Sequence, residues 1–380
     1  MRRVAVAGIG LTQVSEHWED ALKDLFAQAA LKAIDDAGMR EIDALYVSNM
    51  GAAPLQGQLQ LGAMMADTIG MRGVAAVRVE AASASGGVAF HEGVKAVASG
   101  MCDAVLVGGV EKMSDGLPEE LSSAIAMSED QEYTAYTGVT VVGLSALLHR
   151  LYMERYGATA KEVAMFAVRG HENAVGCPHA QYPFRVSVDR VLASPMEADP
   201  THTLECSGVG DGAAAVILVP ADGIETGVEV ASTAVATDSY YLEGRKDLLE
   251  FDAARKASER ALNAAGVSHS EVDVLEVHDD TTITGVLSLE SLGFVERGMG
   301  ASYVAGGNTT RGGELPTNTF GGLKARGDPL GATGLYQICE VVMQLRREAG
   351  PCQVEGAEVG MAQSLGGVGS TCAVSVLRRA

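Results

Sequence analysis

Residues 29–47 read AALKAIDDAGMREIDALYV and residues 257–277 read ASERALNAAGVSHSEVDVLEV, so one pattern occurs twice in this chain. Each copy is a helix that ends at Ala-Gly, followed by a short link and a β-rich run. Helices that alternate with short strands predict βαβ units and a largely parallel sheet. Any α/β chain shows some likeness among its βα units, but the matching order and the matching helix ends favour a duplicated fold.

The duplication extends to the flanking segments. A β-branched run precedes each helix, and a glycine-rich helix start and a last strand follow in each half. The corresponding segments are 4–10 with 228–236, 85–100 with 331–350, and 103–110 with 371–377. We therefore expect two sheets with helices between and outside them.

A long segment of different character interrupts the first half. Residues 115–205 are rich in Met, Tyr, His and charge, and they contain helical patterns at 143–157 and 160–174. An insertion of this length is more often a functional cap or an interface than a structureless loop. The expected division is a first half of residues 1–114 and 206–222, an inserted loop domain of residues 115–205, and a second half of residues 223–380.

The composition excludes several classes of protein. A net charge of −21 over 380 residues opposes binding to nucleic acid, whose phosphates would be repelled. The start MRRVAVAGIG reads as a first strand rather than a signal peptide, and no stretch approaches the roughly 20 apolar residues that cross a bilayer. We expect a soluble, cytoplasmic protein that binds neither membrane nor nucleic acid.

The cysteines predict reduced, scattered thiols and no metal site, because their spacing matches no metal-ligand pattern. They are Cys102, Cys177, Cys206, Cys339, Cys352 and Cys372.

Several long motifs, in order along the whole chain, resemble those of thiolases, the enzymes that join or split acyl-CoA thioesters. The likeness is greatest to the archaeal-type and sterol-carrier-type branch. The motifs are VEAASASGG (79–87), GGVEKMSD (108–115), ECSGVGDGAAAVIL (205–218), EVHDD (276–280), GGELPTNTFGGLKARGDPLGATG (312–334) and AQSLGGVGSTCAV (362–374).

The resemblance implies a duplicated thiolase fold, five-layered as α/β/α/β/α, with residues 115–205 as a loop domain that covers coenzyme A. It implies an acyl-CoA thioester as substrate or ligand, no covalently bound cofactor, and a homodimer or a dimer of dimers. Relatives in this branch assemble with hydroxymethylglutaryl-CoA (HMG-CoA) synthase and a zinc-binding OB-fold protein, which are therefore candidate partners.

Two positions depart from the family pattern. Ser83 stands where the family has its nucleophilic cysteine, and Asp328 stands where it has the histidine that activates this cysteine. A thiol before a helix loses its proton readily, whereas a serine hydroxyl needs a neighbouring base. Ser83 is therefore either a nucleophile or a helix N-cap. Asp328 is either a weak base or the cap of a helix that starts at Pro329.

Other candidate site residues follow from the same motifs. The resemblance implies that His278, after a predicted buried strand, helps to hold the thioester oxygen in an oxyanion hole, although such a histidine can be structural. Gly366 and Gly367 resemble the loop that completes the other oxyanion hole, or they serve the turn alone. Asp280 is a third departure, because the family more often has an uncharged residue there. Its charge would disfavour an enolate.

Three functions follow from this pattern. The first is acyl-CoA C-acyltransfer of the acetyl-CoA and acetoacetyl-CoA type through Ser83, His278 and Asp328, with weak or absent thiolase turnover because the thiolate is missing. The second is a catalytically degenerate subunit that binds coenzyme A or stabilises a complex with the candidate partners. The third is retro-aldol cleavage of a coenzyme A thioester, which needs a base and an oxyanion hole but no thiol.

Overall fold

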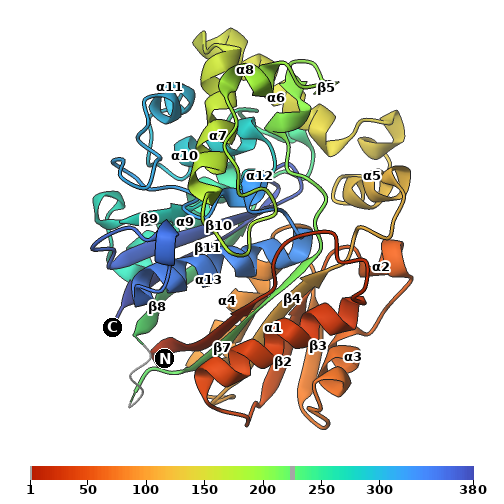
Figure 1. The fold of residues 1–380 in the computed structure, drawn as a ribbon, viewed down its shortest axis with the longest axis vertical. Coiled ribbons are helices and arrows are strands. Elements are labelled where there is room, and N and C mark those ends of the chain that lie inside the picture. The colour runs from red at the N-terminus through yellow and green to blue at the C-terminus, as the bar shows by residue number, and fades with distance from the viewer. Residues whose placement is uncertain (1, 223–226) are drawn as a thin grey trace.

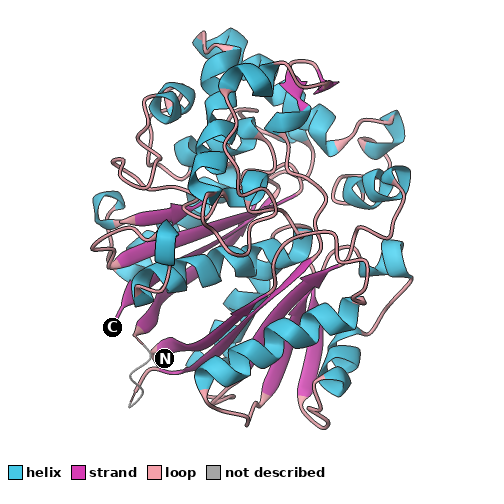
Figure 2. Ribbon diagram, in the orientation of Figure 1, coloured by secondary structure: helices cyan, strands magenta, loops and turns pink. Residues whose placement is uncertain are grey.

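Nine strands form one mixed sheet in the computed structural model, which describes residues 2–222 and 227–380 (Figures 1 and 2). Their order is β3-β2-β4-β7-β1-β8-β11-β10-β9, and the short strands β5 and β6 pair separately. The bounds are β1 Val4–Leu11, β2 Ala44–Ser48, β3 Ala75–Val79, β4 Val105–Glu111, β5 Met196–Ala198, β6 Thr201–His202, β7 Gly212–Pro220, β8 Val228–Thr237, β9 Val274–Glu276, β10 Val359–Gly366 and β11 Thr371–Arg379.

The sheet consists of two halves that join where β1 pairs with β8. In the first half, β2 and β4 are parallel, whereas β7 is antiparallel to both β4 and β1. The second half repeats this arrangement, with β9 parallel to β10, and β11 antiparallel to both β10 and β8. Even β3 has a partial counterpart, because Thr317 forms a parallel bridge to Leu275 in β9. The predicted duplication is confirmed.

Three expectations about the strands are wrong. The two expected sheets are halves of one nine-stranded sheet, because β1 pairs with β8. The sheet is mixed rather than largely parallel, because β7 and β11 return antiparallel between their neighbours and no helix links β10 to β11. The strand 371–377 was also expected to match 103–110. Its counterpart is instead β7, while β4 matches β10. The insertion separates β4 from β7, which obscures this correspondence in the sequence.

Helices form three layers around the two half-sheets, which confirms the five-layer arrangement (Figure 1). The helices α4 and α13 contact each other and fill the central layer, α1 and α3 cover the first half-sheet, and α9 packs on β8 and β11. The bounds are α1 Leu22–Ala37, α2 Ala52–Gln56, α3 Leu61–Thr68, α4 Ser85–Ser99, α5 Pro118–Ala126, α6 Val141–Tyr156, α7 Ala160–Ala174, α8 Val188–Leu192, α9 Asp252–Ala265, α10 Thr282–Ser291, α11 Gly300–Ala305, α12 Gly322–Ala325 and α13 Thr333–Arg346.

Short 3₁₀ turns complete the fold. They are η1 Ala135–Thr137, η2 Thr203–Glu205, η3 Leu242–Gly244, η4 His269–Glu271, η5 Leu330–Ala332 and η6 Gly350–Cys352.

The central helices touch backbone to backbone at their first turns. A Cβ atom added to Gly86 would lie 2.8 Å from the backbone nitrogen of Leu335, and one added to Gly334 would lie 2.5 Å from that of Gly87. Real Cβ atoms do not approach other atoms this closely, so only glycine fits. The contact holds the N-terminal ends of α4 and α13 side by side.

The long helices of the inserted segment pack on the second half of the molecule, whereas α5 contacts α2 in the first half. Helices α6 and α7 confirm the helical patterns expected at 143–157 and 160–174, and α7 contacts α10, α11 and α12. The helices α6, α7 and α8 lie at the top of the view in Figure 1, above the second half-sheet, whereas α5 lies at the right next to α2 of the first half. The expected boundary between residues 222 and 223 borders residues 223–226, which lie outside the described residues.

The first half-sheet depends on a second close approach, between β1 and α1. A Cβ atom on Gly10 would lie 2.1 Å from the carbonyl oxygen of Ala29 and 2.7 Å from the nitrogen of Ala33. We predict that Gly10→Ala lowers the free energy of unfolding by about 3 kcal/mol, because α1 must move off the strand. Chemical denaturation measures the change. Gly312→Ala is the control, since its added Cβ would meet nothing within 4 Å, and an equal effect of the two substitutions would contradict the prediction.

Candidate functional site

One pocket gathers most of the residues that the sequence motifs single out. Ser83, His278, Asp280, Asp328 and Gly367 all line it, and its volume is about 120 Å³. It lies where α4 and η5 begin and β9 ends, with the inserted segment on its far side. Gly366 adjoins the pocket without lining it. The remaining lining residues are Met113, Ile125, Ser128, Val141, Val142, Cys206, Ser207, Gly208, Val209, Thr281 and Leu330.

Ser83 lies in a strained turn just before α4. Ala82 has a φ of 49°, a left-handed conformation that is unfavourable for a residue with a side chain. The Ser85 hydroxyl holds the turn, because it donates to the carbonyl of Ala82 and accepts from the Ala81 N–H at 2.8 Å. The residue that precedes the helix is Ala84, so the interpretation of Ser83 as the N-cap is wrong. Within the described part of the chain, the Ser83 hydroxyl makes no hydrogen bond.

Asp328 is a buried carboxyl group held by hydroxyls. Its Oδ1 accepts from Thr333 Oγ1 at 2.5 Å, and its Oδ2 accepts from Ser207 Oγ at 3.4 Å. Burial raises the pKa of Asp328, although His278 and the Thr333 hydroxyl oppose this shift. The expected helix cap at Asp328 is wrong, because η5 begins at Leu330 after Pro329 and α13 follows Ala332.

His278 is buried at the end of β9 and is neutral at physiological pH. Burial lowers its pKa to about 4, even though the nearby Asp328 raises it. Its backbone N–H donates to Gln363 Oε1 at 2.8 Å, which fixes the residue against β10. The ring nitrogen Nδ1 is buried and lacks a partner among the described residues. A neutral imidazole can donate one hydrogen bond and accept another.

The two acids after His278 have different surroundings. Asp279 accepts from the Leu323 N–H at 2.7 Å and so binds the first turn of α12. Asp280 lines the pocket and accepts from the Thr281 N–H at 2.8 Å. Burial raises the pKa of Asp280 as it does that of Asp328. Both carboxyl groups therefore bind protons more readily than exposed ones, and the pocket is less negative than the residue types suggest.

The loop after β10 reaches the pocket at Gly367. This residue has a φ of 57°, and an added Cβ would lie 2.7 Å from Glu129 Oε1. Glu129 comes from the inserted segment and accepts from the Val368 N–H at 2.9 Å. Gly366 needs no unusual backbone angle, but an added Cβ would lie 2.4 Å from the Ala81 carbonyl oxygen. The glycines therefore fit this loop between the Ser83 turn and Glu129.

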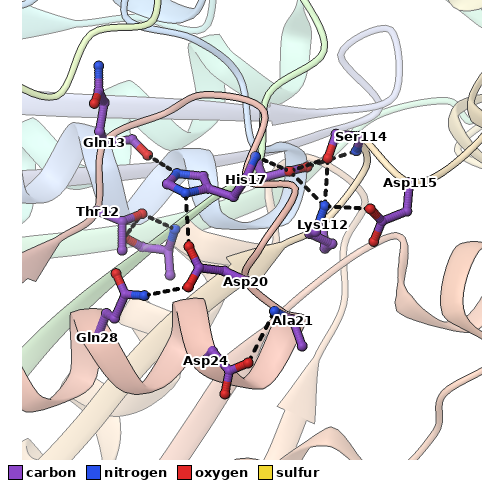
Figure 3. Close-up of polar contacts among 12 residues, drawn as sticks. Thr12, Gln13, His17, Asp20, Ala21, Asp24, Gln28, Lys112, Ser114 and Asp115 are labelled. Atoms are coloured by element: carbon purple, nitrogen blue, oxygen red, sulfur yellow. Dashed lines mark hydrogen bonds and ion pairs between the residues drawn. The ribbon is translucent and has the colours of Figure 1, made fainter.

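A polar network fixes another wall of the pocket. Lys112 is buried and bonds to Ser114, Asp115 and Asp211, as Figure 3 shows for the first two. Asp211 also accepts from the N–H of Met113, a pocket residue, at 2.6 Å. Burial would raise the pKa of Asp211, but hydrogen bonds from the Ser114 hydroxyl and from the N–H groups of Met113, Ser114 and His17 hold it below the ordinary value. The network ties β4, β7 and the loop before α1 together.

The sequence motifs did not identify three side chains in or beside the pocket. Cys206 places a thiol in the pocket, and burial raises its pKa to about 12, so it stays protonated. Ser207 and Thr333 supply the hydroxyls on Asp328. These residues belong to the family-like motifs ECSGVGDG and GDPLGATG. A single sequence does not indicate which side chains of a motif face a pocket.

The described ranges, 2–222 and 227–380, contain neither a cluster of metal ligands nor a membrane-spanning helix. No three His, Cys, Asp or Glu side chains there gather so that they could hold a metal ion. No helix in these ranges combines the length and the apolar character needed to span a membrane.

Comparison with known proteins gives a consistent result. The family model described as thiolase, N-terminal domain, matches residues 4–222, and that described as thiolase C-terminal domain-like matches residues 234–379. The chain is 45% identical to the acetyl-CoA acetyltransferase of Methanothermobacter thermautotrophicus, with 100% of both chains covered. It is 31% identical to human sterol carrier protein 2, with 100% of this chain and 72% of that protein covered.

A solved structure shares the fold. The structure titled "Ltp2-ChsH2(DUF35) aldolase" superposes with a TM-score of 0.85 at 22% identity, covering 99% of this chain and 98% of that one.

The turn before α4 yields a stability prediction that separates its two serines. Ser83→Ala should change the free energy of unfolding by less than about 0.5 kcal/mol, because the hydroxyl has no partner in the described structure. Ser85→Ala should cost roughly 1 kcal/mol, because it leaves the half-buried Ala81 N–H without its partner, whereas the Ala82 carbonyl keeps the Ser85 N–H at 3.0 Å. Urea unfolding compares them. A Ser83→Ala loss as large as that of Ser85→Ala would show that Ser83 has a structural role.

Proposed function

Since this chain belongs to the thiolase family and is similar to acetyl-CoA acetyltransferases, we propose that it acts on coenzyme A thioesters through acid–base chemistry. The reaction that fits the pocket best is aldol-type cleavage of a β-hydroxyacyl-CoA into a ketone and a shorter acyl-CoA, or its reverse. The observation that carries this proposal is the buried pair of Asp328 and neutral His278 in one pocket with a Ser83 hydroxyl that lacks a base.

The two departures from the family pattern remove the thiol route. A thiolase forms a covalent acyl-enzyme on cysteine, which a histidine activates. Ser83 and Asp328 replace that pair here. A serine hydroxyl needs a base within hydrogen-bond reach, and no described side chain holds the Ser83 hydroxyl. The carboxyl group of Asp328 bonds to Ser207 and Thr333 instead.

Aldol-type cleavage requires only groups that this pocket contains. Ionised Asp328 takes the proton from the substrate's β-hydroxyl, the bond between the α- and β-carbons breaks, and its electron pair becomes the enolate of the thioester. Neutral His278 donates a hydrogen bond to the thioester oxygen, where the negative charge develops. The proton that Asp328 accepted then passes to the α-carbon, which gives the acyl-CoA, leaves a ketone and restores the ionised carboxylate. No thiolate takes part.

Two similarities to known proteins support aldol-type cleavage. The solved structure described above, which shares the fold, bears the name of an aldolase. The relatives named acetyl-CoA acetyltransferases also make or break a bond beside a thioester carbonyl, so the enolate is common to both reactions. The substrate class proposed here is therefore an acyl-CoA with a β-hydroxyl group.

A second candidate is acyl transfer through Ser83, and one observation favours it. The strained Ala82 turn presents Ser83 to the pocket at the start of α4, where the positive end of the helix dipole stabilises developing negative charge. The third possibility, a non-catalytic subunit that binds coenzyme A within a larger complex, would leave both reactions without turnover.

The lyase assay tests the first proposal. Release of ketone from β-hydroxyacyl-CoA substrates is measured for the wild type and for Asp328→Asn, which should lower kcat by on the order of 10² to 10⁴ through loss of the base. Activity should rise with pH as Asp328 loses its proton, and this acidic limb should lie above the ordinary aspartate pKa because burial raises it. Asp280→Asn, in the same pocket, is the control and should cost less than about tenfold. Equal losses would contradict the assigned base.

Intact mass spectrometry tests the second candidate. After incubation with acetyl-CoA, the wild type should gain no acetyl group, because Ser83 lacks an activating base. An adduct that disappears in Ser83→Ala would establish acyl transfer and would overturn the lyase proposal if it forms at the rate of turnover. Thiolysis that appears in a Ser83→Cys, Asp328→His double variant would show that the pocket still admits coenzyme A.

A further inference from the structure

Two cysteine side chains meet at a point remote from the pocket. Cys177 follows α7 in the inserted segment, and Cys352 ends η6 after α13. Both thiols are free and buried in one cluster, and the Cys352 thiol donates to the Asn173 carbonyl at 3.8 Å. The neighbouring residues also touch, because a Cβ atom on Gly176 would lie 2.9 Å from the Cβ of Pro351.

Arg311 holds the two segments in this position. Its Nη1 donates to the carbonyl of Pro351, beside Cys352. Its Nη2 donates to the carbonyls of Glu172 at 3.2 Å and Val175 at 3.4 Å, on the Cys177 side. One guanidinium group therefore joins both backbones within two residues of each cysteine. These bonds hold the two segments that place the thiols in one buried cluster.

We propose that Cys177 and Cys352 are a modification site at which a small-molecule disulfide forms a reversible intramolecular disulfide. The inference does not depend on the proposed function, since neither cysteine lines the pocket. Neither thiol has a catalytic task in the reaction above.

The surroundings give the two sulfurs different roles. The neighbouring Cys177 thiol and the positive charge of Arg311 lower the pKa of Cys352, although burial opposes this. The neighbouring Cys352 thiol and burial raise the pKa of Cys177. Cys352 is therefore the thiolate that attacks first, and Cys177 is the thiol that resolves the intermediate.

The exchange is balanced in atoms and electrons. The Cys352 thiolate attacks one sulfur of the small disulfide, which forms a mixed disulfide and releases one small thiolate. Cys177 then attacks the Cys352 sulfur and releases the second small thiolate, while the protons of the two cysteines pass to the two products. The protein pair loses two electrons and the reagent gains them.

Access to the pair needs only a local opening. Gly176 and Pro178 flank Cys177 and are exposed, and Pro351, which precedes Cys352, is also exposed. Each buried thiol therefore adjoins an exposed residue in the chain. Short segments of this kind open more readily than the core strands.

The cross-link would act on the segment that supports Asp328. Just beyond Cys177, the Gln181 N–H donates to the Arg326 carbonyl and the Tyr182 N–H donates to the Ala325 carbonyl, both at 2.9 Å. A disulfide would join this segment covalently to η6, which follows α13. Because it closes a very long loop of chain, it should stabilise the folded protein.

The test uses the full-length protein and hydroxyethyl disulfide, a small uncharged reagent. We expect the intact mass to fall by about 2 Da as the two thiol protons are lost, and a proteolytic peptide pair to link residues 177 and 352. The midpoint of thermal unfolding should rise by on the order of 5 °C and return after reduction.

Single substitutions check the order of attack. Cys177→Ala should stop at a mixed disulfide on Cys352, whereas Cys352→Ala should leave Cys177 unmodified. Cys102→Ser, at a more exposed thiol, is the control and should form the cross-link as the wild type does. The proposal fails if Cys102 reacts in the native wild type while no peptide links 177 to 352, or if that link forms only in denaturant.

Discussion

The contact between Gly86 and Gly334 is the constraint on which the site depends. The two halves of the chain each supply a central helix, and these helices touch backbone to backbone at their first turns. Ser83 lies just before one helix and Asp328 lies just before the short turn that leads into the other. A side chain at either glycine would push the helix ends apart and open the pocket between the two halves. The duplicated fold therefore creates the site by juxtaposing two equivalent helix starts.

Burial then determines how the side chains in this site behave. Arg326 is fully buried next to Asp328, with its guanidinium group 4.9 Å from the Tyr336 ring centre and paired with Glu340. Isolated buried charges are costly, so this cation and its acidic neighbours stabilise each other. His278 carries no charge because burial lowers its pKa, while burial raises that of Asp328. The pocket combines a neutral donor with a carboxyl group that binds its proton more tightly, a pairing suited to proton transfer.

Much of this arrangement could be predicted from the sequence, because the repeat and the motifs are local features. The two helix–strand copies at 29–47 and 257–277 indicated the layers, and the motifs around Ser83, His278 and Asp328 indicated residues that do line one pocket. Strand direction was not predictable in the same way. Periodicity shows that a segment is a strand but not which way it runs, and the insertion hides that β7 returns antiparallel beside β4.

The details that bear most on chemistry come from contacts between distant segments. That Ser83 is not a cap depends on where α4 begins, and the hydroxyls on Asp328 come partly from Ser207, far away in the chain. The Ser83 turn is held by Ser85 and by the close packing of Gly366 on Ala81, neither of which involves the side chain at 83. The scaffold would therefore present a cysteine or a serine in the same place. Which reaction follows is decided by the side chains at 83 and 328, since the fold preserves the turn whatever nucleophile it carries.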